Sequence, residues 1–114
     1  MEKFLYLFRG GMDYTAASPE AMQTNMQKWN QWMGKLMQDG IMQGGEPLQA
    51  ASKKVAGKSK VVTDGPFAEA KEIVGGYLLI NANDINHAVE LSKGCPIFEM
   101  DGSVEVRPIQ KMEM

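Results

Sequence analysis

Thr63-Asp64-Gly65-Pro66-Phe67-Ala68-Glu69-Ala70-Lys71-Glu72-Ile73-Val74-Gly75-Gly76-Tyr77 is the stretch around which the rest of the chain is organised. The Asp-Gly-Pro triplet predicts a chain reversal, because proline fixes its own φ and disfavours helix in the residue before it. Charged residues follow, and then an apolar strand expected over residues 73–82, whose paired glycines predict a bulge or a close backbone approach. Since loops held by a rigid scaffold carry function, we expect a binding site at this turn.

Length and composition restrict the class of protein. The 114 residues fit a single domain, 1–114. With 12 basic and 14 acidic residues, the chain lacks the positive field that nucleic-acid binding requires. The lone Cys95 excludes an internal disulfide, and the apolar run within residues 1–9 is too short for a signal peptide or a membrane span. We therefore expect a reduced, cytoplasmic protein that contacts neither nucleic acid nor membrane.

The first half of the chain predicts a strand, a long helix and a hairpin. Residues 4–8 are apolar on both alternating faces, which is typical of a strand covered on both sides. Ser18 as N-cap, Pro19 and a stop at Gly40 predict a helix over 19–38. Its inward stripe is expected to contain Met22, Met26, Trp29, Met33 and Leu36. Trp32 lies beside this stripe, either partly buried in the core or as the wall of a pocket.

A short, bent strand is expected over 41–48, followed by a hairpin that pairs 53–55 with 60–63. The hairpin lysines form either a solvated edge that discourages aggregation or, less favoured, a phosphate site. A second helix is expected after Asn83 or Asp84, with Ile85, Ala88, Val89 and Ser92 facing inward. The last strand, over 104–109, places Glu105 and Arg107 on one side.

This order of elements predicts an α+β, ferredoxin-like fold, in which two helices cover one face of an antiparallel sheet. The other face also carries apolar residues, and the helices cannot cover both sides. We therefore expect a homodimer that packs sheet to sheet as an α+β barrel.

Several motifs resemble those of the DGPF-type branch of the YCII-related proteins. They are the segments 64–72, 75–77 (Gly-Gly-Tyr), 95–96 (Cys-Pro) and 102–108 (Gly-Ser-Val-Glu-Val-Arg-Pro). The resemblance covers nearly the whole chain and implies a ferredoxin-like fold that dimerises as an α+β barrel. Association of some family members with alternative sigma factors implies an accessory or regulatory role as an alternative to catalysis.

One feature of better understood YCII-like relatives is missing from this chain. They are thought to use a histidine in the first helix together with an aspartate, whereas residues 26–30 here are Met-Gln-Lys-Trp-Asn. The one histidine, His87, is expected at a solvated position of the second helix. Catalysis by a histidine and an aspartate is therefore not expected in this chain.

Acid-base chemistry would then fall to carboxylates, and we take Asp64 and Glu72 as candidate catalytic residues, with Glu69 and Glu105 as further candidates. The structural alternatives are that Asp64 caps its own turn and that Arg107 pairs with Glu105 or Glu72. Cys95 is not expected to be a nucleophile. The chain shows no metal-ligand spacing and no nucleotide motif, so no metal and no cofactor is expected.

The sequence thus favours a dimer that binds a small, planar or anionic molecule in a pocket between sheet and helices, with enzymatic turnover left open. The expected ligand-binding residues are Phe67, Tyr77, Arg107, Trp29 and Trp32. The alternative function is a non-catalytic accessory or regulatory module that meets a protein partner.

Overall fold

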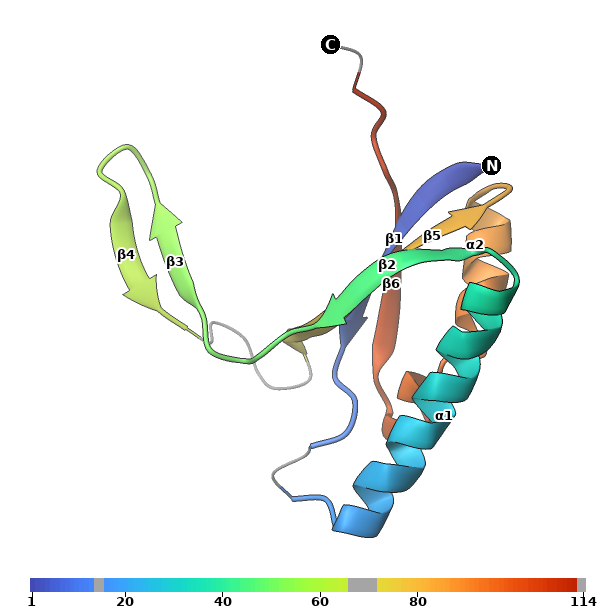
Figure 1. Ribbon diagram of the computed structural model, residues 1–114. Helices are drawn as coiled ribbons and strands as arrows, with labels where there is room; N and C mark the ends of the chain where they lie inside the picture. Colours follow the sequence, from blue (N-terminus) through green and yellow to red (C-terminus); the bar gives the residue numbers. More distant parts are fainter. Residues whose placement is uncertain (14–15, 66–71, 113–114) are drawn as a thin grey trace.

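A computed structural model describes residues 1–13, 16–65 and 72–112. A four-stranded antiparallel sheet has the order β2-β5-β1-β6, and two helices cover one of its faces (Figure 1). The described elements are β1 (Glu2–Arg9), α1 (Pro19–Gln38), β2 (Met42–Pro47), β3 (Lys53–Ala56), β4 (Val61–Asp64), β5 (Val74–Ala82), α2 (Ile85–Ser92), the 3-10 helix η2 (Pro96–Met100) and β6 (Ser103–Pro108). This is the predicted ferredoxin-like topology, with the β3–β4 hairpin inserted between the second and third strands of the sheet.

The long helix has the predicted bounds. Ser18 Oγ accepts a hydrogen bond from the Ala21 amide at 3.1 Å, and Gly40 leaves the helix with φ +72°. The inward face is made by Asn25, Trp29, Trp32, Met33 and Leu36. The prediction was wrong for Met26, which is 57% exposed. The inward face follows residues 25, 29, 32 and 36, so Asn25 takes the buried position and Met26, the next residue, points toward solvent.

The core lies between the helices and the sheet. Alternate side chains of β1 and β5 fill it, namely Phe4, Tyr6, Phe8, Leu78, Ile80 and Ala82. Trp32 stacks on Tyr6 with ring centroids 6.3 Å apart, and Trp29 meets Phe8 edge to face at 5.1 Å. Trp32 is partly buried against the core, and it also lines a groove beside α1, so both possibilities hold in part. Its Nε1 donates to the Leu91 carbonyl at 3.3 Å.

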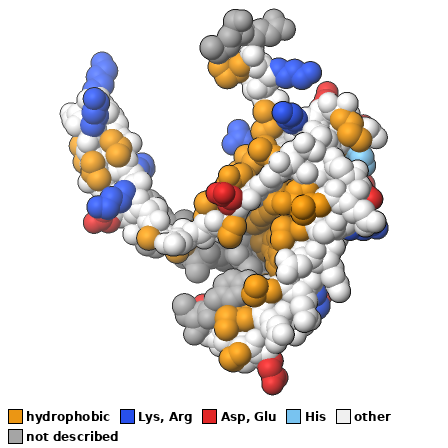
Figure 2. Space-filling view, viewed as in Figure 1, with side chains coloured by type: hydrophobic (Ala, Val, Ile, Leu, Met, Phe, Trp, Pro, Cys, Tyr) orange, Lys and Arg blue, Asp and Glu red, His pale blue; other side chains and the backbone are white. Residues whose placement is uncertain are grey.

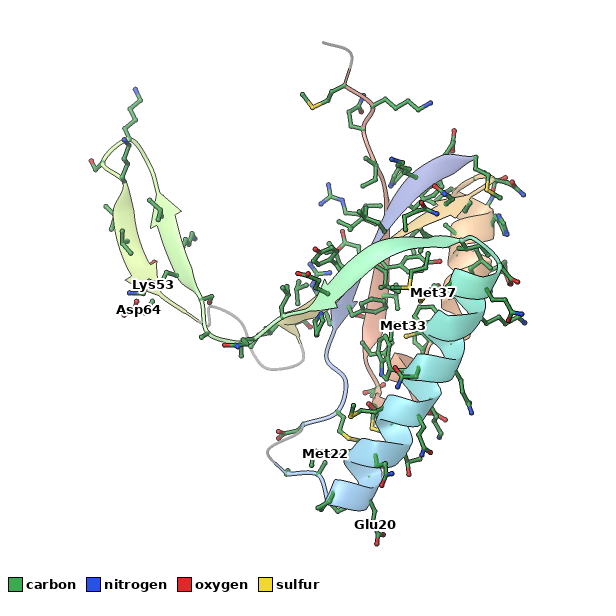
Figure 3. The ribbon with its side chains drawn as sticks, in the orientation of Figure 1. Glu20, Met22, Met33, Met37, Lys53 and Asp64 are labelled. Atoms are coloured by element: carbon green, nitrogen blue, oxygen red, sulfur yellow. The ribbon has the colours of Figure 1, made fainter. Side chains whose placement is uncertain are left out.

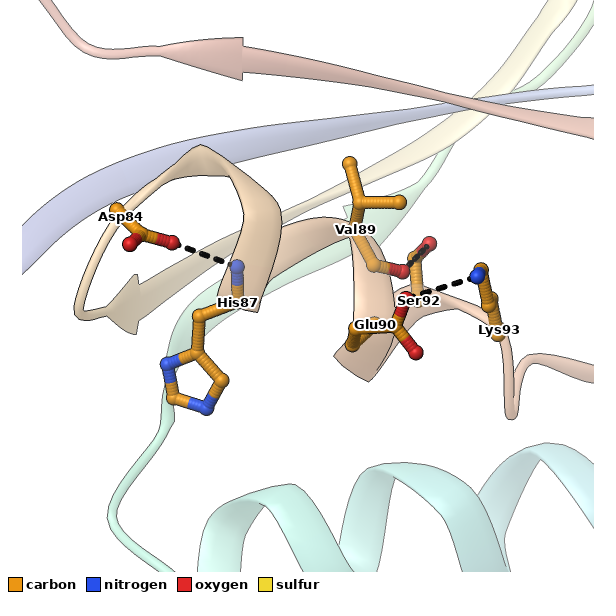
Figure 4. A network of polar contacts seen from close by, with 6 residues as sticks. All are labelled: Asp84, His87, Val89, Glu90, Ser92 and Lys93. Atoms are coloured by element: carbon orange, nitrogen blue, oxygen red, sulfur yellow. Dashed lines mark hydrogen bonds and ion pairs between the residues drawn. The ribbon is translucent and has the colours of Figure 1, made fainter.

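The second helix is capped by Asp84, whose Oδ1 accepts from the His87 amide at 2.8 Å (Figure 4). Its buried side is formed by Ala88 and Ser92. Ile85, expected to face inward, is 43% exposed, because it opens a two-turn helix that rests on the core through those two small side chains.

Glycines shape the pairing of β5 with both of its neighbours, β1 and β2. The register steps from Phe8 opposite Gly76 to Arg9 opposite Val74, so Gly75 forms the predicted bulge. A Cβ on Gly45 would lie 2.4 Å from the Tyr77 carbonyl oxygen, which shows how closely the bent strand β2 approaches its neighbour. These irregularities lie beside Tyr77, at the end of the sheet from which the hairpin leaves.

The hairpin of residues 53–64, here called the arm, stands apart from the helices and the sheet (Figure 1). Every residue of β3 and β4 is exposed, and within the described part of the chain the two strands pair only with each other. The chain accordingly has a radius of gyration of 15.9 Å, against roughly 13 Å for a compact domain of this length. The predicted hairpin is confirmed, with its loop one residue later than expected, at 57–60.

Candidate functional site

The face of the sheet that points away from the helices carries an apolar floor. The pairing register places Tyr77, Leu7 and Glu105 in one row across three strands, and Leu79, Leu5 and Arg107 in the next row. The four uncharged side chains, Leu5, Leu7, Tyr77 and Leu79, are all only partly buried. We call this surface the open face and define it by these six residues together with Arg9.

Charged side chains border the apolar floor on the β6 side. Arg9 Nη1 lies 2.5 Å from Glu105 Oε1, and Arg107 Nε lies 3.8 Å from Glu105 Oε2. One carboxylate thus lies between two guanidinium groups, which leaves an excess of one positive charge at this edge. A planar guanidinium on a rigid strand can donate two parallel hydrogen bonds to a carboxylate or phosphate.

Two of the predicted ligand-binding residues, Tyr77 and Arg107, share this face. Tyr77 on β5 and Arg107 on β6 flank β1 from opposite sides, in adjacent rows. The side chain of Arg107 is 65% exposed, so its donors are accessible from solvent. An aromatic ring and a guanidinium on a common apolar floor can hold a planar, anionic molecule.

Trp29 and Trp32 lie on the other side of the sheet. Both project from α1 into the aromatic cluster with Tyr6 and Phe8, at centroid distances of 5.1 to 6.3 Å. The sheet therefore separates the two tryptophans from Tyr77 and Arg107, and no single pocket between sheet and helices contains all four. The aromatic side chains themselves fill the space in which such a pocket was expected.

The proposed catalytic carboxylates lie outside the open face. Asp64 ends β4 at the foot of the arm, where its Oδ1 lies 3.5 Å from Lys53 Nζ (Figure 3). Its side chain is 81% exposed. Glu72 is also exposed, just before β5. Phe67 and Glu69 fall outside the described residues.

Arg9 is the site residue that the sequence reasoning missed. It closes the polar border of the open face and lies nearer to Glu105 than Arg107 does. The sequence could have indicated the face on which Arg9 lies, because residues two apart on a strand share a face and Leu5, Leu7 and Arg9 follow this spacing. The strand order was needed as well, since only the adjacency of β1 and β6 brings Arg9 to Glu105.

Two buried ionisable groups belong to the core and not to the open face. Burial raises the pKa of the Cys95 thiol to about 12, with a smaller opposing effect from a hydrogen bond with the Ile97 backbone. Burial also raises the pKa of Tyr6, and the neighbouring Cys95 adds to the effect. The Tyr6 hydroxyl donates to the Ala88 carbonyl. Cys95 is therefore a protonated, largely buried thiol at neutral pH, in line with the expectation that it is not a nucleophile.

Other surfaces offer less chemistry. A groove of about 520 Å³ beside α1 is lined by Lys28, Trp32, Lys93 and Phe98 among others, but Lys28 is already held by Glu99 at 3.0 Å. Within the described ranges, no group of three or more histidine, cysteine, aspartate or glutamate side chains could hold a metal ion. Among the helices of those same ranges, none is long and apolar enough to cross a membrane.

The family model described as the YCII-related domain matches residues 10–113, from the end of β1 to beyond β6. The chain belongs to the YCII-related family. This match spans every element described above except β1. Tyr77, Leu79, Glu105 and Arg107 of the open face lie inside the matched range, whereas Leu5, Leu7 and Arg9 lie outside it. It confirms the family-level resemblance seen in the sequence motifs.

One solved structure similar to this YCII-related chain is 5-chloro-2-hydroxyhydroquinone dehydrochlorinase from Burkholderia phenoliruptrix, in complex with 2,5-dihydroxybenzoquinone. The two chains share 14% identity with a TM-score of 0.48, over 95% of this chain and 93% of the other. A search among curated proteins finds no match.

Proposed function

We propose that this YCII-related protein, a member of the DGPF-type branch, binds a small planar or anionic molecule on the open face. One observation carries the proposal: an apolar floor of Leu5, Leu7, Tyr77 and Leu79 is bordered by the Arg9–Glu105–Arg107 cluster, and the described parts of the chain leave it uncovered. Apolar surface with a few convergent polar groups is the usual composition of ligand sites.

The proposed active form is a homodimer. Half-buried leucines on a sheet face gain stability from being covered, at about 25 cal/mol for each Å² removed from water. Packing two open faces against each other by a two-fold axis would close them into an α+β barrel. The ligand would then lie between the sheets, with Tyr77 against its ring and Arg107 against its anionic group.

Turnover in this site would depend on carboxylates, and Asp64 and Glu72 stay the proposed acid-base pair. Both are exposed in the single chain, so each would need to be brought into a buried setting by the ligand or by the partner. Phe67 stays a proposed ligand contact, and Trp29 and Trp32 are proposed to support the floor from behind. The reduced thiol of Cys95 fits a cytoplasmic location.

The test is a thermal-shift screen of the purified protein against aromatic acids, inorganic phosphate and nucleotides, repeated with Arg107→Ala. A ligand at 100 times its Kd adds about 2.7 kcal/mol to the free energy of unfolding. The shift should vanish in Arg107→Ala and persist in Lys93→Ala, which removes a cation from the helix side. A shift that survives Arg107→Ala, or the lack of any hit, contradicts the proposed site.

The alternative function is a non-catalytic accessory module, and the arm is the observation that favours it. The four lysines 53, 54, 58 and 60 are exposed on a projecting hairpin that could meet an acidic protein surface. Replacing these lysines by glutamates should abolish partner binding under this alternative. The same change should leave ligand binding to Arg107 intact under the leading proposal.

A further inference from the structure

The arm exposes more aliphatic surface than an isolated hairpin should. Val55, Val61 and Val62 are 64%, 58% and 57% exposed, although they make up much of the arm's two short strands. A two-stranded hairpin is at best marginally stable in water unless something packs on it. Figure 2 shows these hydrophobic side chains on the arm and, across the gap, hydrophobic side chains on the body.

The two faces of the arm differ. Val55 lies directly opposite Val62, and the next pair on that face is Lys53 with Asp64, joined by their ion pair. The other face pairs Ala56 with Val61 and Lys54 with Thr63. The first face therefore presents a paired aliphatic surface whose adjacent charges are already neutralised, which suits it for burial against another surface.

The charge of the arm favours this same protein as its partner. The arm has four lysines and one aspartate, whereas the whole chain has a net charge of −2, so the remaining residues are net acidic. Glu46 adds an exposed carboxylate at the rim of the open face, because it lies opposite Tyr77 on the edge strand β2. A cationic arm is therefore complementary to the β2 rim of a second copy, where Glu46 lies, and not to the β6 edge, where Arg9 and Arg107 leave an excess of positive charge.

We propose that the two copies of the homodimer exchange arms, each arm laying its Val55–Val62 face on the rim of the open face of the other copy. This inference rests on the proposed dimer and adds a second contact to its sheet-to-sheet packing. It explains why the arm projects from its own chain with aliphatic side chains uncovered. By two-fold symmetry each exchanged arm is matched by the other, so the contact closes without further assembly.

The test compares Val62→Asp with Val61→Asp by sedimentation over a range of protein concentrations. The two valines are neighbours of nearly equal exposure on opposite faces of the arm, and both are remote from the core. Val62→Asp should weaken the dimer at least 10-fold, because it buries a carboxylate, while Val61→Asp should change the dimer Kd by less than about 2-fold. Unchanged far-UV circular dichroism would show that both variants fold.

The failures of the two proposals are distinguishable. A wild-type dimer that neither variant weakens overturns the exchange of arms and leaves the dimer standing, as does equal weakening by both. A wild-type chain that stays monomeric at every concentration overturns the dimer and the exchange together. In that case the exposed arm would be assigned to a different protein partner.

Discussion

Arg9 on β1 and Glu105 on β6 meet across the open face, with Nη1 and Oε1 2.5 Å apart. Glu105 also lies within 3.8 Å of Arg107 on its own strand, so one carboxylate serves two guanidinium groups. The side chains of Arg9 and Glu105 are 27% and 44% exposed, so solvent limits the energy of this contact. The main consequence of this ion pair is that Glu105 competes with an anionic ligand for the two arginines, and its contribution to the stability of the fold is small.

Glu105→Gln should tighten the binding of an anionic ligand, because it removes the carboxylate that competes for both arginines. An exposed pair of this kind is worth about 0.2–1 kcal/mol, so the gain should be a few-fold in Kd at most. Titration calorimetry with a hit from the thermal-shift screen measures it. Glu90→Gln, which breaks an ion pair on α2, is the matched control and should leave Kd unchanged. Weaker binding in Glu105→Gln would mean that the carboxylate itself contacts the ligand.

Tyr6→Phe should lower the free energy of unfolding by about 1–2 kcal/mol, because it deletes the buried hydrogen bond to the Ala88 carbonyl. Urea denaturation of the purified protein measures the loss. Tyr77→Phe removes the same atom from the partly buried open face, and a change below about 0.5 kcal/mol is expected there. Equal losses in the two variants would show that the Tyr6 bond contributes nothing specific.

The stability of the protein should fall in alkaline solution. The pKa of the Cys95 thiol rises from its ordinary 9.0 to about 12 on folding, so its contribution is fully present below pH 9 and is lost as pH rises toward 12. Burial raises the pKa of Tyr6 as well, which adds a loss in the same direction. Between its two pKa values, each such group is deprotonated in the unfolded state and protonated in the folded state. It then lowers the free energy of unfolding by about 1.4 kcal/mol per pH unit.

Urea denaturation at several values between about pH 8 and about pH 11 measures this slope in the wild type and in Cys95→Ala. The variant loses core volume and starts less stable, but its slope should be shallower because one titrating group is gone. A slope identical to that of the wild type would contradict the assignment of the loss to Cys95.

Gly45→Ala should destabilise the sheet, because the new Cβ would lie 2.3 Å from Leu78 Cδ2 and 2.4 Å from the Tyr77 carbonyl oxygen. Strain of this kind typically costs about 1–3 kcal/mol, and a backbone atom cannot move aside as a side chain can. Thermal unfolding measures the cost. Gly44→Ala is the matched control, since no heavy atom lies within 4 Å of its added Cβ. Its Tm should stay near that of the wild type.

Much of the fold could be predicted from local signals. Ser18, Pro19 and Gly40 set the ends of α1 because caps and stops act within one helical turn. The paired glycines predicted the bulge at Gly75 for an equally local reason. The exposure of Met26 could not be predicted in this way, because the rotation of a helix about its axis is settled by what it packs against.

The candidate site, like the fold, was predicted from the sequence only where local signals sufficed. Sequence alone determined which residues of β6 share a face, and so placed Glu105 and Arg107 together, because strand side chains alternate. Only the tertiary structure decided that Tyr77 joins Arg107 while Trp29 and Trp32 lie behind the sheet, since this depends on strand order and on the face that the helices cover. It likewise decided that Arg9 meets Glu105 and that the arm leaves the body, because contacts between residues distant in sequence are fixed by the packing of the whole chain.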